Sequence, residues 1–263
     1  MTKIPCSVCI LTHNSAAGLA RALESVRDFD EKIICDGGST DATLEIAARY
    51  GARVILQDNA FKDSTGKITD FSGVRNQYLA AAAHDWIFAL DSDERITEAL
   101  AEEVRSACNT EPTAYWVLRK YEFKNTVIEH AMNYPARQMR FFHRAAVEKY
   151  FKSIHERILV KDGARVKTLK GYMIVPVAEE GFETVKRKWC AYIELERARR
   201  APISLRTWVR KSAREVAIMG RYLFRLARVQ LQKGAKFPIM VEVRIFWYQW
   251  HVIAMLFSKI NRL

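Results

Sequence analysis

One short stretch constrains the fold of this 263-residue chain more than any other: residues 84–94, His-Asp-Trp-Ile-Phe-Ala-Leu-Asp-Ser-Asp-Glu. Its five consecutive apolar residues, 86–90, predict a strand that is buried on both faces. The strand ends in three acids within four residues, Asp91, Asp93 and Glu94. In open α/β sheets, ligands bind just outside the carboxyl ends of such strands. We therefore expect a ligand site at this strand end.

The carboxylates of Asp91 and Asp93, set two residues apart, suit a hard divalent cation with oxygen ligands, such as Mg²⁺ or Mn²⁺. Such a cation would in turn hold a diphosphate. In a simpler interpretation, Asp93 and Glu94 cap a helix expected over residues 96–109. That interpretation leaves Asp91, which still lies in the strand, unexplained, and we favour the metal site.

The N-terminal part of the chain alternates between strands and helices. Strands are expected over residues 4–11, 32–35 and 53–56, with helices ending at Val26 and spanning residues 42–50. This alternation predicts an α/β fold with a parallel, doubly wound sheet. Asn14 or Ser15 is the expected N-cap of the first helix, and Gly51 is the expected C-cap of the second.

The turn at residues 36–41, Asp-Gly-Gly-Ser-Thr-Asp, follows the second strand. Its glycines allow a phosphate or a ribose to approach the backbone closely. A plain strand-to-helix turn capped by Ser39 or Asp41 is an equal alternative. The first strand is not followed by Gly-x-Gly-x-x-Gly, and no Gly-Lys-Ser/Thr loop occurs. These absences weigh against a dinucleotide oxidoreductase and a phosphate-loop protein.

The five cysteines do not suggest a metal site or a disulfide framework. Cys6 and Cys9 lie three apart in the first strand, so their side chains should point to opposite faces. No second close pair is present to complete a zinc site. We expect reduced, buried thiols in a cytoplasmic protein, without a signal peptide because the N-terminus enters a strand almost at once.

Four segments occur in the order and spacing of family 2 glycosyltransferases with a GT-A fold: residues 7–14, 36–43, 71–76 and 91–94. The set resembles most closely the bacterial glucosyltransferases of the lipopolysaccharide-core type. The resemblance implies that Thr12, Asn14 and Asp36 bind the nucleoside of a nucleotide sugar. Many relatives carry a second acid where this chain has Gly37, so the resemblance fixes the base less firmly than the fold.

The same resemblance assigns the remaining site residues. Arg75 would reach the diphosphate, Asp91 would bind the nucleotide sugar at its ribose, and Asp93 would bind the metal. A His-Glu pair, His155 and Glu156, stands where similar enzymes carry one. His155 is then a metal or diphosphate contact and Glu156 the general base, although a surface polar pair is the ordinary interpretation of such residues.

The net charge of +12 is confined to the last third of the chain. Residues 1–181 contain 24 Lys+Arg and 25 Asp+Glu, a net charge of −1, whereas residues 182–263 contain 18 Lys+Arg and 5 Asp+Glu, a net charge of +13. We therefore predict a catalytic GT-A domain over residues 1–181 and a basic, aromatic-rich helical region over residues 182–263. No RNA- or DNA-reading motif accompanies this charge, so no nucleic-acid partner is expected.

A helix over residues 206–228 would carry an arginine stripe within an arc of about 100°. Its members are Arg206, Arg210, Arg214, Arg221, Arg225 and Arg228, and an apolar side lies opposite: Trp208, Val209, Val216, Met219, Leu223, Leu226 and Val229. Solvated charged faces normally mix signs, but this stripe contains no acid. The pattern is typical of an interfacial helix on anionic lipid.

The segment 239–260 is rich in aromatic residues, but its uncharged run, residues 245–258, is shorter than the roughly 20 residues needed to span a bilayer. We expect a helix that contacts the membrane from one side or a second copy of the chain. Burial against the catalytic domain is the alternative. The expected location is the cytoplasmic face of the bacterial inner membrane, as a peripheral protein.

Together these features predict a metal-dependent, inverting glycosyltransferase. It would move a hexose such as glucose from a nucleotide donor, UDP-hexose, to a lipid-linked saccharide such as the lipopolysaccharide core. One alternative is transfer to a polyprenyl phosphate, an acceptor that is already anionic and needs less help from a base. An alternative of another class is a non-catalytic membrane adaptor that retains the GT-A fold.

Overall fold

The computed structural model describes residues 2–153 and 156–260, and the chain forms two compact units. The first, here called the sheet unit, comprises Met1–Tyr121 and Pro135–Pro176. The second, the helical unit, comprises Glu122–Tyr134 and Val177–Leu263. This division differs from the boundary expected after residue 181 chiefly in residues 122–134, which belong to the helical unit.

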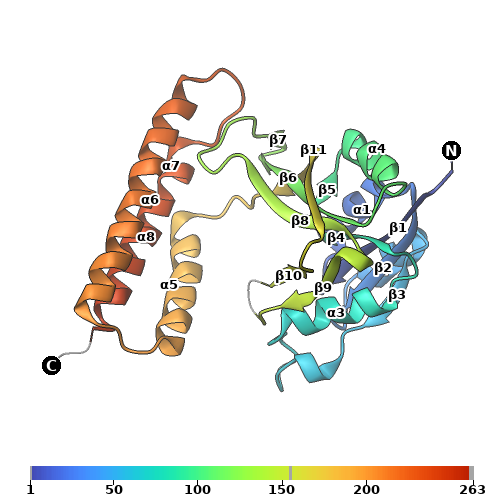
Figure 1. Cartoon of the computed structure of the whole chain (residues 1–263), viewed down its shortest axis with the longest axis horizontal. Coiled ribbons are helices and arrows are strands. Elements are labelled where there is room, and N and C mark those ends of the chain that lie inside the picture. Colours follow the sequence, from blue (N-terminus) through green and yellow to red (C-terminus); the bar gives the residue numbers. More distant parts are fainter. Residues whose placement is uncertain (1, 154–155, 261–263) are drawn as a thin grey trace. The chain divides into compact units, whose positions relative to one another are not determined.

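The main sheet has the strand order β3-β2-β1-β4-β8-β6-β11-β5 (Figure 1). The strands are β1 (Ile4–Thr12), β2 (Phe29–Asp36), β3 (Arg53–Leu56), β4 (Trp86–Asp91), β5 (Arg95–Ile96), β6 (Thr113–Phe123), β8 (Ala136–His143) and β11 (Arg165–Pro176). The first four are parallel, as predicted from the alternation of strands and helices. The pairs β4–β8, β6–β8 and β5–β11 are antiparallel.

Helices cover both faces of the parallel strands. They are α1 (Ala16–Ser25), α2 (Thr43–Arg49), α3 (Phe71–Ala81) and α4 (Glu98–Ala107), with short 3-10 turns η1 (Asn59–Phe61) and η2 (Arg144–Ala146). Apolar residues of α1, α2 and α4 pack with Phe88 and Leu90 on one face of β4, and those of α3 pack with Ile87 on the other. The predicted burial of this strand on both faces is therefore confirmed. Cys6 and Cys9 lie on opposite faces, as expected.

The parallel register brings the carboxyl ends of three strands to one edge. Leu11 in β1 is paired with Cys35 in β2 and with Asp91 in β4. The loops that follow β1, β2 and β4 therefore emerge side by side. A separate two-stranded antiparallel sheet, β9 (Val147–Phe151) and β10 (Arg157–Val160), completes the sheet unit.

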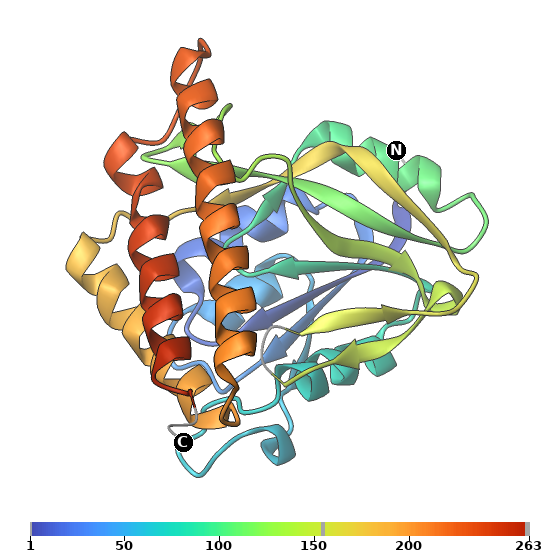
Figure 2. The ribbon, with the colours of Figure 1, turned by 60° about the vertical axis from the view of Figure 1, so that its left-hand side comes forward.

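The helical unit is built around α5 (Phe182–Arg199), α6 (Leu205–Leu231), α7 (Ile239–Glu242) and α8 (Arg244–Phe257), with the short strand β7 (Thr126–Val127) paired to the end of β6. Helices α6 and α8 run side by side (Figure 2). Ile193, Met255 and Leu256 form a small buried core between α5, α6 and α8. Among the described residues, no helix is both long and apolar enough to cross a membrane.

Candidate active site at the carboxyl ends of the parallel strands

Asp36, at the end of β2, organises the loop that follows it. The side chain is fully buried and accepts four hydrogen bonds, from Thr12 Oγ1 (2.7 Å), Gly38 N (2.8 Å), Ser39 N (2.7 Å) and Ser39 Oγ (2.6 Å). Burial alone would raise the pKa of Asp36, but these hydrogen bonds outweigh it and hold the pKa below its usual value. Asp36 and Thr12 thus fix the loop geometry, and their contact with a nucleoside stays a prediction.

Asn14 joins the loops after β1 and β2. Its backbone N–H donates to Ser39 Oγ (2.8 Å), and its Oδ1 accepts from Thr40 N (2.8 Å). The residue has a φ of +49°, a left-handed conformation that asparagine tolerates better than most residues. The two loops therefore form one polar rim at the sheet edge, where Asn14 was predicted to bind the nucleoside.

The cap of α1 comes from a residue that the sequence did not indicate. Ser15 occupies the predicted N-cap position, but its side chain makes no capping hydrogen bond. Instead Asp41 Oδ2, from the loop after β2, accepts from Ala16 N (3.0 Å), while Asp41 Oδ1 accepts from Thr43 N (3.0 Å). One carboxylate thereby holds two helix N-termini together.

Gly37, where the resemblance leads us to expect a second acid, is closely surrounded by side chains. A Cβ on Gly37 would lie 3.0 Å from Gln57 Oε1 and 3.2 Å from the His13 side chain. Gln57 is buried, and its Nε2 donates to Thr12 O (3.2 Å) and Cys35 O (3.1 Å). A side chain in place of Gly37 would therefore require Gln57 and His13 to shift by a few tenths of an ångström.

The two acids predicted at the end of β4 differ in their surroundings. Asp91 contacts two arginines: Oδ2 accepts from Arg140 (2.5 Å) and Oδ1 from Arg75 (3.0 Å). Burial would raise the pKa of Asp91, but the guanidinium groups of Arg140 and Arg75 outweigh it and hold this pKa well below its usual range. Asp93, by contrast, is exposed.

Asp93 lies against α1. A Cβ added to Gly18 would come within 3.0 Å of the Asp93 Cα, and Ser92 Oγ lies 3.1 Å from Ser15 Oγ. Partial burial and the neighbouring charge of Asp91 raise the pKa of Asp93. The described residues contain no cluster of three His, Cys, Asp or Glu side chains that would hold a metal by itself. A single carboxylate supplemented by substrate phosphates and water is nevertheless a common way to bind Mg²⁺, so Asp93 fits a cation that arrives with a diphosphate.

Arg75 connects α3, β4 and the segment before β10. Its Nε donates to Glu156 Oε1 (2.5 Å) and its Nη1 to Tyr78 Oη (2.9 Å). The neighbouring Asn76 bonds the backbone of Tyr150 in both directions, at 2.8 Å and 3.0 Å, and so fixes β9 to α3. Arg75, Asp91 and Glu156, which are distant in sequence, are thus brought together. The other half of the predicted pair, His155, lies outside the described residues.

The comparison with known families decides the class of this protein. Residues 7–170 match the family described as Glycosyl transferase family 2, and this range contains every predicted site residue from Thr12 to Glu156. The chain belongs to glycosyl transferase family 2. The match agrees with the predicted GT-A-like α/β fold.

Individual relatives match a shorter part of this chain than the family does. An uncharacterized glycosyltransferase of Rickettsia felis is 37% identical over 105 residues, which are 40% of this chain and 33% of the relative. The lipopolysaccharide core biosynthesis glycosyltransferase LpsC of Rhizobium meliloti is 29% identical over 103 residues, 38% of this chain and 36% of the relative. The chain therefore spans about a third of the length of these curated relatives. The crystal structure of S. aureus TarS 1–349 in complex with UDP aligns over 71% of this chain and 64% of its own, with 19% identity and a TM-score of 0.43.

Four arginines close to the predicted site residues were missed by the sequence reasoning. Arg119 in β6, Arg137 and Arg140 in β8, and Arg157 in β10 line a cleft of about 690 Å³ together with Arg75, Asp91 and Glu156. Buried Glu94 accepts from both Arg140 and Arg119 (3.3 Å each). The available signal was a set of charged residues within two strands that otherwise contribute apolar side chains to the core.

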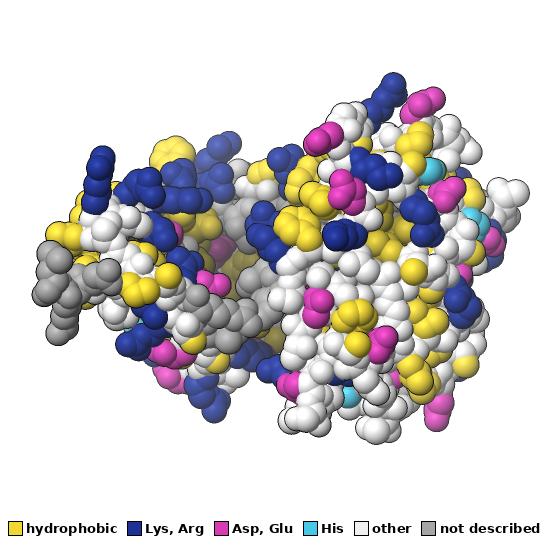
Figure 3. Space-filling model, turned by 60° about the horizontal axis from the view of Figure 1, so that its bottom comes forward, with side chains coloured by type: hydrophobic (Ala, Val, Ile, Leu, Met, Phe, Trp, Pro, Cys, Tyr) yellow, Lys and Arg dark blue, Asp and Glu magenta, His cyan; other side chains and the backbone are white. Residues whose placement is uncertain are grey.

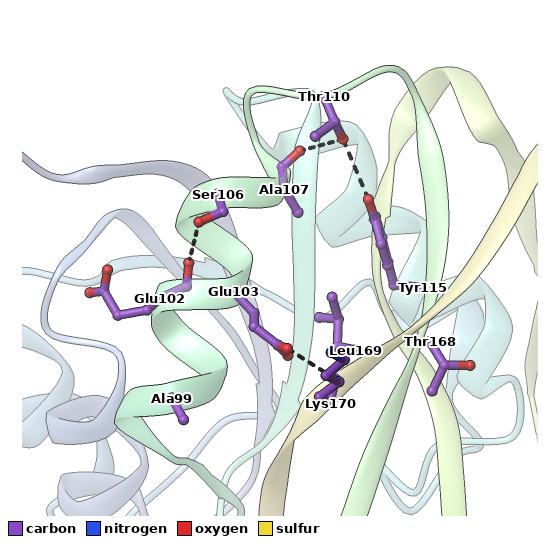
Figure 4. A pocket seen from close by; sticks show the side chains of 10 residues that line it. All are labelled: Ala99, Glu102, Glu103, Ser106, Ala107, Thr110, Tyr115, Thr168, Leu169 and Lys170. Carbon is purple, nitrogen blue, oxygen red and sulfur yellow. Dashed lines mark hydrogen bonds between the residues drawn. The ribbon is translucent and has the colours of Figure 1, made fainter.

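A second hollow, of about 450 Å³, lies between α4, β6 and β11 (Figure 4). None of the predicted site residues lines it. Glu103, one of its lining residues, accepts from the backbone N–H groups of Lys170 (3.2 Å) and Gly171 (2.8 Å), and so fastens α4 to β11. None of the predicted roles therefore falls on this hollow, whereas Arg75, Asp91 and Glu156 line the cleft beside β4.

Proposed function

We propose that this chain is a metal-dependent, inverting glycosyltransferase that moves a hexose such as glucose from UDP-hexose to a lipid-linked saccharide such as the lipopolysaccharide core. The observation that carries the proposal is the position of Asp93. It is an exposed carboxylate at the carboxyl end of a buried parallel strand, beside the rim formed by Asn14 and the loop after β2, within the family 2 match. When bound, a Mg²⁺ or Mn²⁺ ion would neutralise charge on the departing diphosphate.

Each protein group then has a task. Asn14 and the loop that Asp36 and Thr12 hold would bind the nucleoside, and Asp93 would hold the cation. Arg75, turned toward Asp91 and Glu156, would sit near the diphosphate. Glu156 lines the cleft and would take the proton from an acceptor hydroxyl that attacks the anomeric carbon. Asp91 would orient the two arginines next to the sugar nucleotide.

Transfer to a polyprenyl phosphate is the second candidate. The observation that favours it is the short contact between Glu156 Oε1 and Arg75 Nε, because the carboxylate oxygen that accepts from Arg75 is already engaged and is not free to take a proton from an acceptor hydroxyl. A phosphate acceptor is already ionised and requires no base. The relative LpsC is named for lipopolysaccharide core biosynthesis and supports the first candidate.

The helical unit supports an acceptor held at a membrane surface. All six arginines of the predicted stripe on α6 are exposed. Exposed apolar residues of the same helix adjoin them: Leu205, Val209, Val216, Leu223, Phe224 and Leu231. Figure 3 shows Lys and Arg side chains beside hydrophobic ones on the surface of the helical unit, at the left of that view. We infer peripheral binding of α6 to anionic lipid at the cytoplasmic face of the inner membrane.

The decisive experiment is a thermal-shift screen of UDP-, GDP- and CDP-sugars, each with Mn²⁺, Mg²⁺ or EDTA. A UDP-hexose should raise the unfolding temperature, and EDTA should abolish the effect. Metal-dependent hydrolysis of the same donor would further exclude a non-catalytic adaptor. If no nucleotide sugar stabilised the protein with either metal, the proposed activity would be wrong.

A further inference from the structure

The cleft beside β4 is strongly basic. Five arginines line it, against only two acids, Asp91 and Glu156. Most of its wall comes from β6, β8 and β10, and none of it comes from the loops after β1 and β2 that are proposed to bind the nucleoside. The described lining of the cleft is therefore separate from the loops proposed to bind the nucleoside, although it shares Arg75 and Asp91 with the proposed donor site.

Three of the five arginines are neutralised by buried or half-buried acids. Arg75 pairs with Asp91 and Glu156, Arg140 with Asp91 and Glu94, and Arg119 with Glu94. These three arginines and three acids have no net charge. Within the described part of the chain, however, the buried Nε atoms of Arg119 and Arg140 have no hydrogen-bond partner, although Arg140 is only 3% exposed. Buried donors are rarely left unpaired, so a missing acceptor is indicated here.

The other two arginines, Arg137 and Arg157, supply the surplus charge. Both are exposed, and neither forms an ion pair with another residue that the structure describes. The guanidinium carbon of Arg137 lies 5.1 Å from the centre of the Trp116 ring, which holds this side chain over the cleft. Guanidinium groups match the planar, bidentate geometry of phosphate and carboxylate groups.

We propose that this cleft binds an anionic group of the acceptor, a phosphate or a carboxylate, through Arg137 and Arg157. The acceptor is then a negatively charged saccharide or lipid-linked saccharide, not a neutral one. The identification of the ligand as an acceptor rests on the proposed glycosyltransferase function. The diphosphate of the donor is the other source of the same chemistry, and the experiment must separate the two.

Isothermal titration with glucose 6-phosphate, and with glucose as the uncharged comparison, tests the cleft with a defined probe. Each titration is carried out without nucleotide and again with saturating UDP and Mn²⁺. We expect glucose 6-phosphate to bind at least about tenfold more tightly than glucose, with or without UDP. Arg137→Gln and Arg157→Gln should each weaken binding of the phosphate probe by about tenfold or more, since each removes a charged hydrogen bond. Both residues are exposed, so the variants should fold.

Two charge-matched variants control for phosphate bound elsewhere on this basic protein. Arg165→Gln, at the exposed start of β11 outside the cleft, and Arg221→Gln, on α6, should leave the affinity for glucose 6-phosphate unchanged. Loss of probe binding when UDP and Mn²⁺ are added, or a tenfold loss of UDP affinity in Arg137→Gln, would assign the arginines to the donor and overturn the proposal. Equal affinity for glucose and its phosphate would also overturn it. Failure of UDP to bind the unmodified protein would contradict the proposed function, while the titrations without nucleotide still decide the anion site.

Discussion

The two aspartates of the turn after β4 illustrate how neighbouring residues of one type acquire different tasks. Asp91 is the last residue of β4 and faces two buried arginines, whereas Asp93 stands in the exposed turn beside α1. Substitution of the two residues should therefore have different consequences. Loss of Asp93 should affect ligand binding, and loss of the Asp91 charge should affect stability.

Asp93→Ala should abolish metal-dependent donor binding and leave the unfolding temperature within about 1–2 °C of the unmodified protein, because exposed side chains contribute little to stability. Asp91→Asn, in contrast, should lower the free energy of unfolding by about 1–3 kcal/mol, since it weakens the contacts of Arg140 and Arg75. Thermal unfolding and titration with UDP and Mn²⁺ measure both effects. Unchanged, Mn²⁺-dependent UDP binding by Asp93→Ala would refute the assignment of Asp93 to the metal.

Glu156→Gln tests the proposed base. The amide keeps the shape of the side chain and removes its basicity, so donor binding should be unchanged while transfer to a hydroxyl acceptor falls by about 10²–10⁴-fold. Initial rates with a saccharide acceptor, together with the Kd for the donor, separate the two effects. Transfer near the unmodified rate would remove Glu156 from the role of base. If Glu156→Gln kept the unmodified rate with a phosphate acceptor but not with a hydroxyl acceptor, the polyprenyl-phosphate reaction would be favoured.

At this scale, the sequence indicated the residues that sit at strand ends, because a strand end can be located from apolar runs and turn signals. It did not indicate which partners these residues have. The contacts of Arg140 with Asp91 and of Asp41 with the N-terminus of α1 join residues that lie 49 and 25 positions apart. Such contacts depend on strand order and register, which local patterns do not specify.

At the scale of elements, close packing between α1 and the turn after β4 positions the proposed metal ligand. Gly18 permits this packing, because any Cβ there would lie 3.0 Å from the Asp93 Cα and 3.1 Å from Ser92 O. Both obstructing atoms belong to, or are attached to, the backbone and cannot rotate away. The backbone of the turn would therefore have to shift by a few tenths of an ångström.

Gly18→Val should lower the free energy of unfolding by about 1–3 kcal/mol through overpacking, and it should also weaken donor binding. The matched control is Gly220→Val on α6, where an added Cβ would meet no atom within 4 Å and the expected change in stability is within about 0.5 kcal/mol. Chemical denaturation and UDP titration compare the two. An equal response to both substitutions would show that helix propensity, and not packing against Asp93, is responsible.

The arginine-bearing helix of the basic region was predicted from the sequence, but which of its apolar residues would be covered by other helices was not. The expected helix over residues 206–228 is present as α6, and its arginine stripe is exposed. Of the apolar residues predicted opposite that stripe, Trp208, Leu226 and Val229 are covered or buried, whereas Val209, Val216 and Leu223 are exposed. Periodicity defines which residues share a face, but tertiary packing decides which of these apolar residues are covered.

At the scale of the whole molecule, charge is divided between the two predicted regions of the chain. Residues 1–181 are nearly neutral and residues 182–263 have a net charge of +13. If the second region binds lipid and the first binds substrate, substitutions in the second region should weaken lipid binding and leave donor hydrolysis intact. This separation is the basis for testing the membrane proposal on the full chain.

The combined variant Arg206→Gln, Arg210→Gln, Arg214→Gln and Arg221→Gln should weaken binding to anionic vesicles by about a hundredfold or more, since each arginine near the surface contributes roughly 1 kcal/mol. These four residues are exposed, and, unlike Arg225, none has a hydrogen bond to another described residue. Metal-dependent donor hydrolysis should persist in the variant. Co-sedimentation with vesicles at two salt concentrations provides the measurement.

The exposed apolar residues supply an independent control. Phe224→Ser and Leu231→Ser together should weaken binding to neutral and anionic vesicles alike, because they remove apolar contacts that do not depend on lipid charge. The arginine contribution should decline as salt rises, since charges are screened over about 10 Å at 0.1 M ionic strength, whereas the apolar contribution should not. Binding of the unmodified protein that is equal for both vesicle types, and unaffected by either set of substitutions, would show that α6 is an ordinary solvated helix.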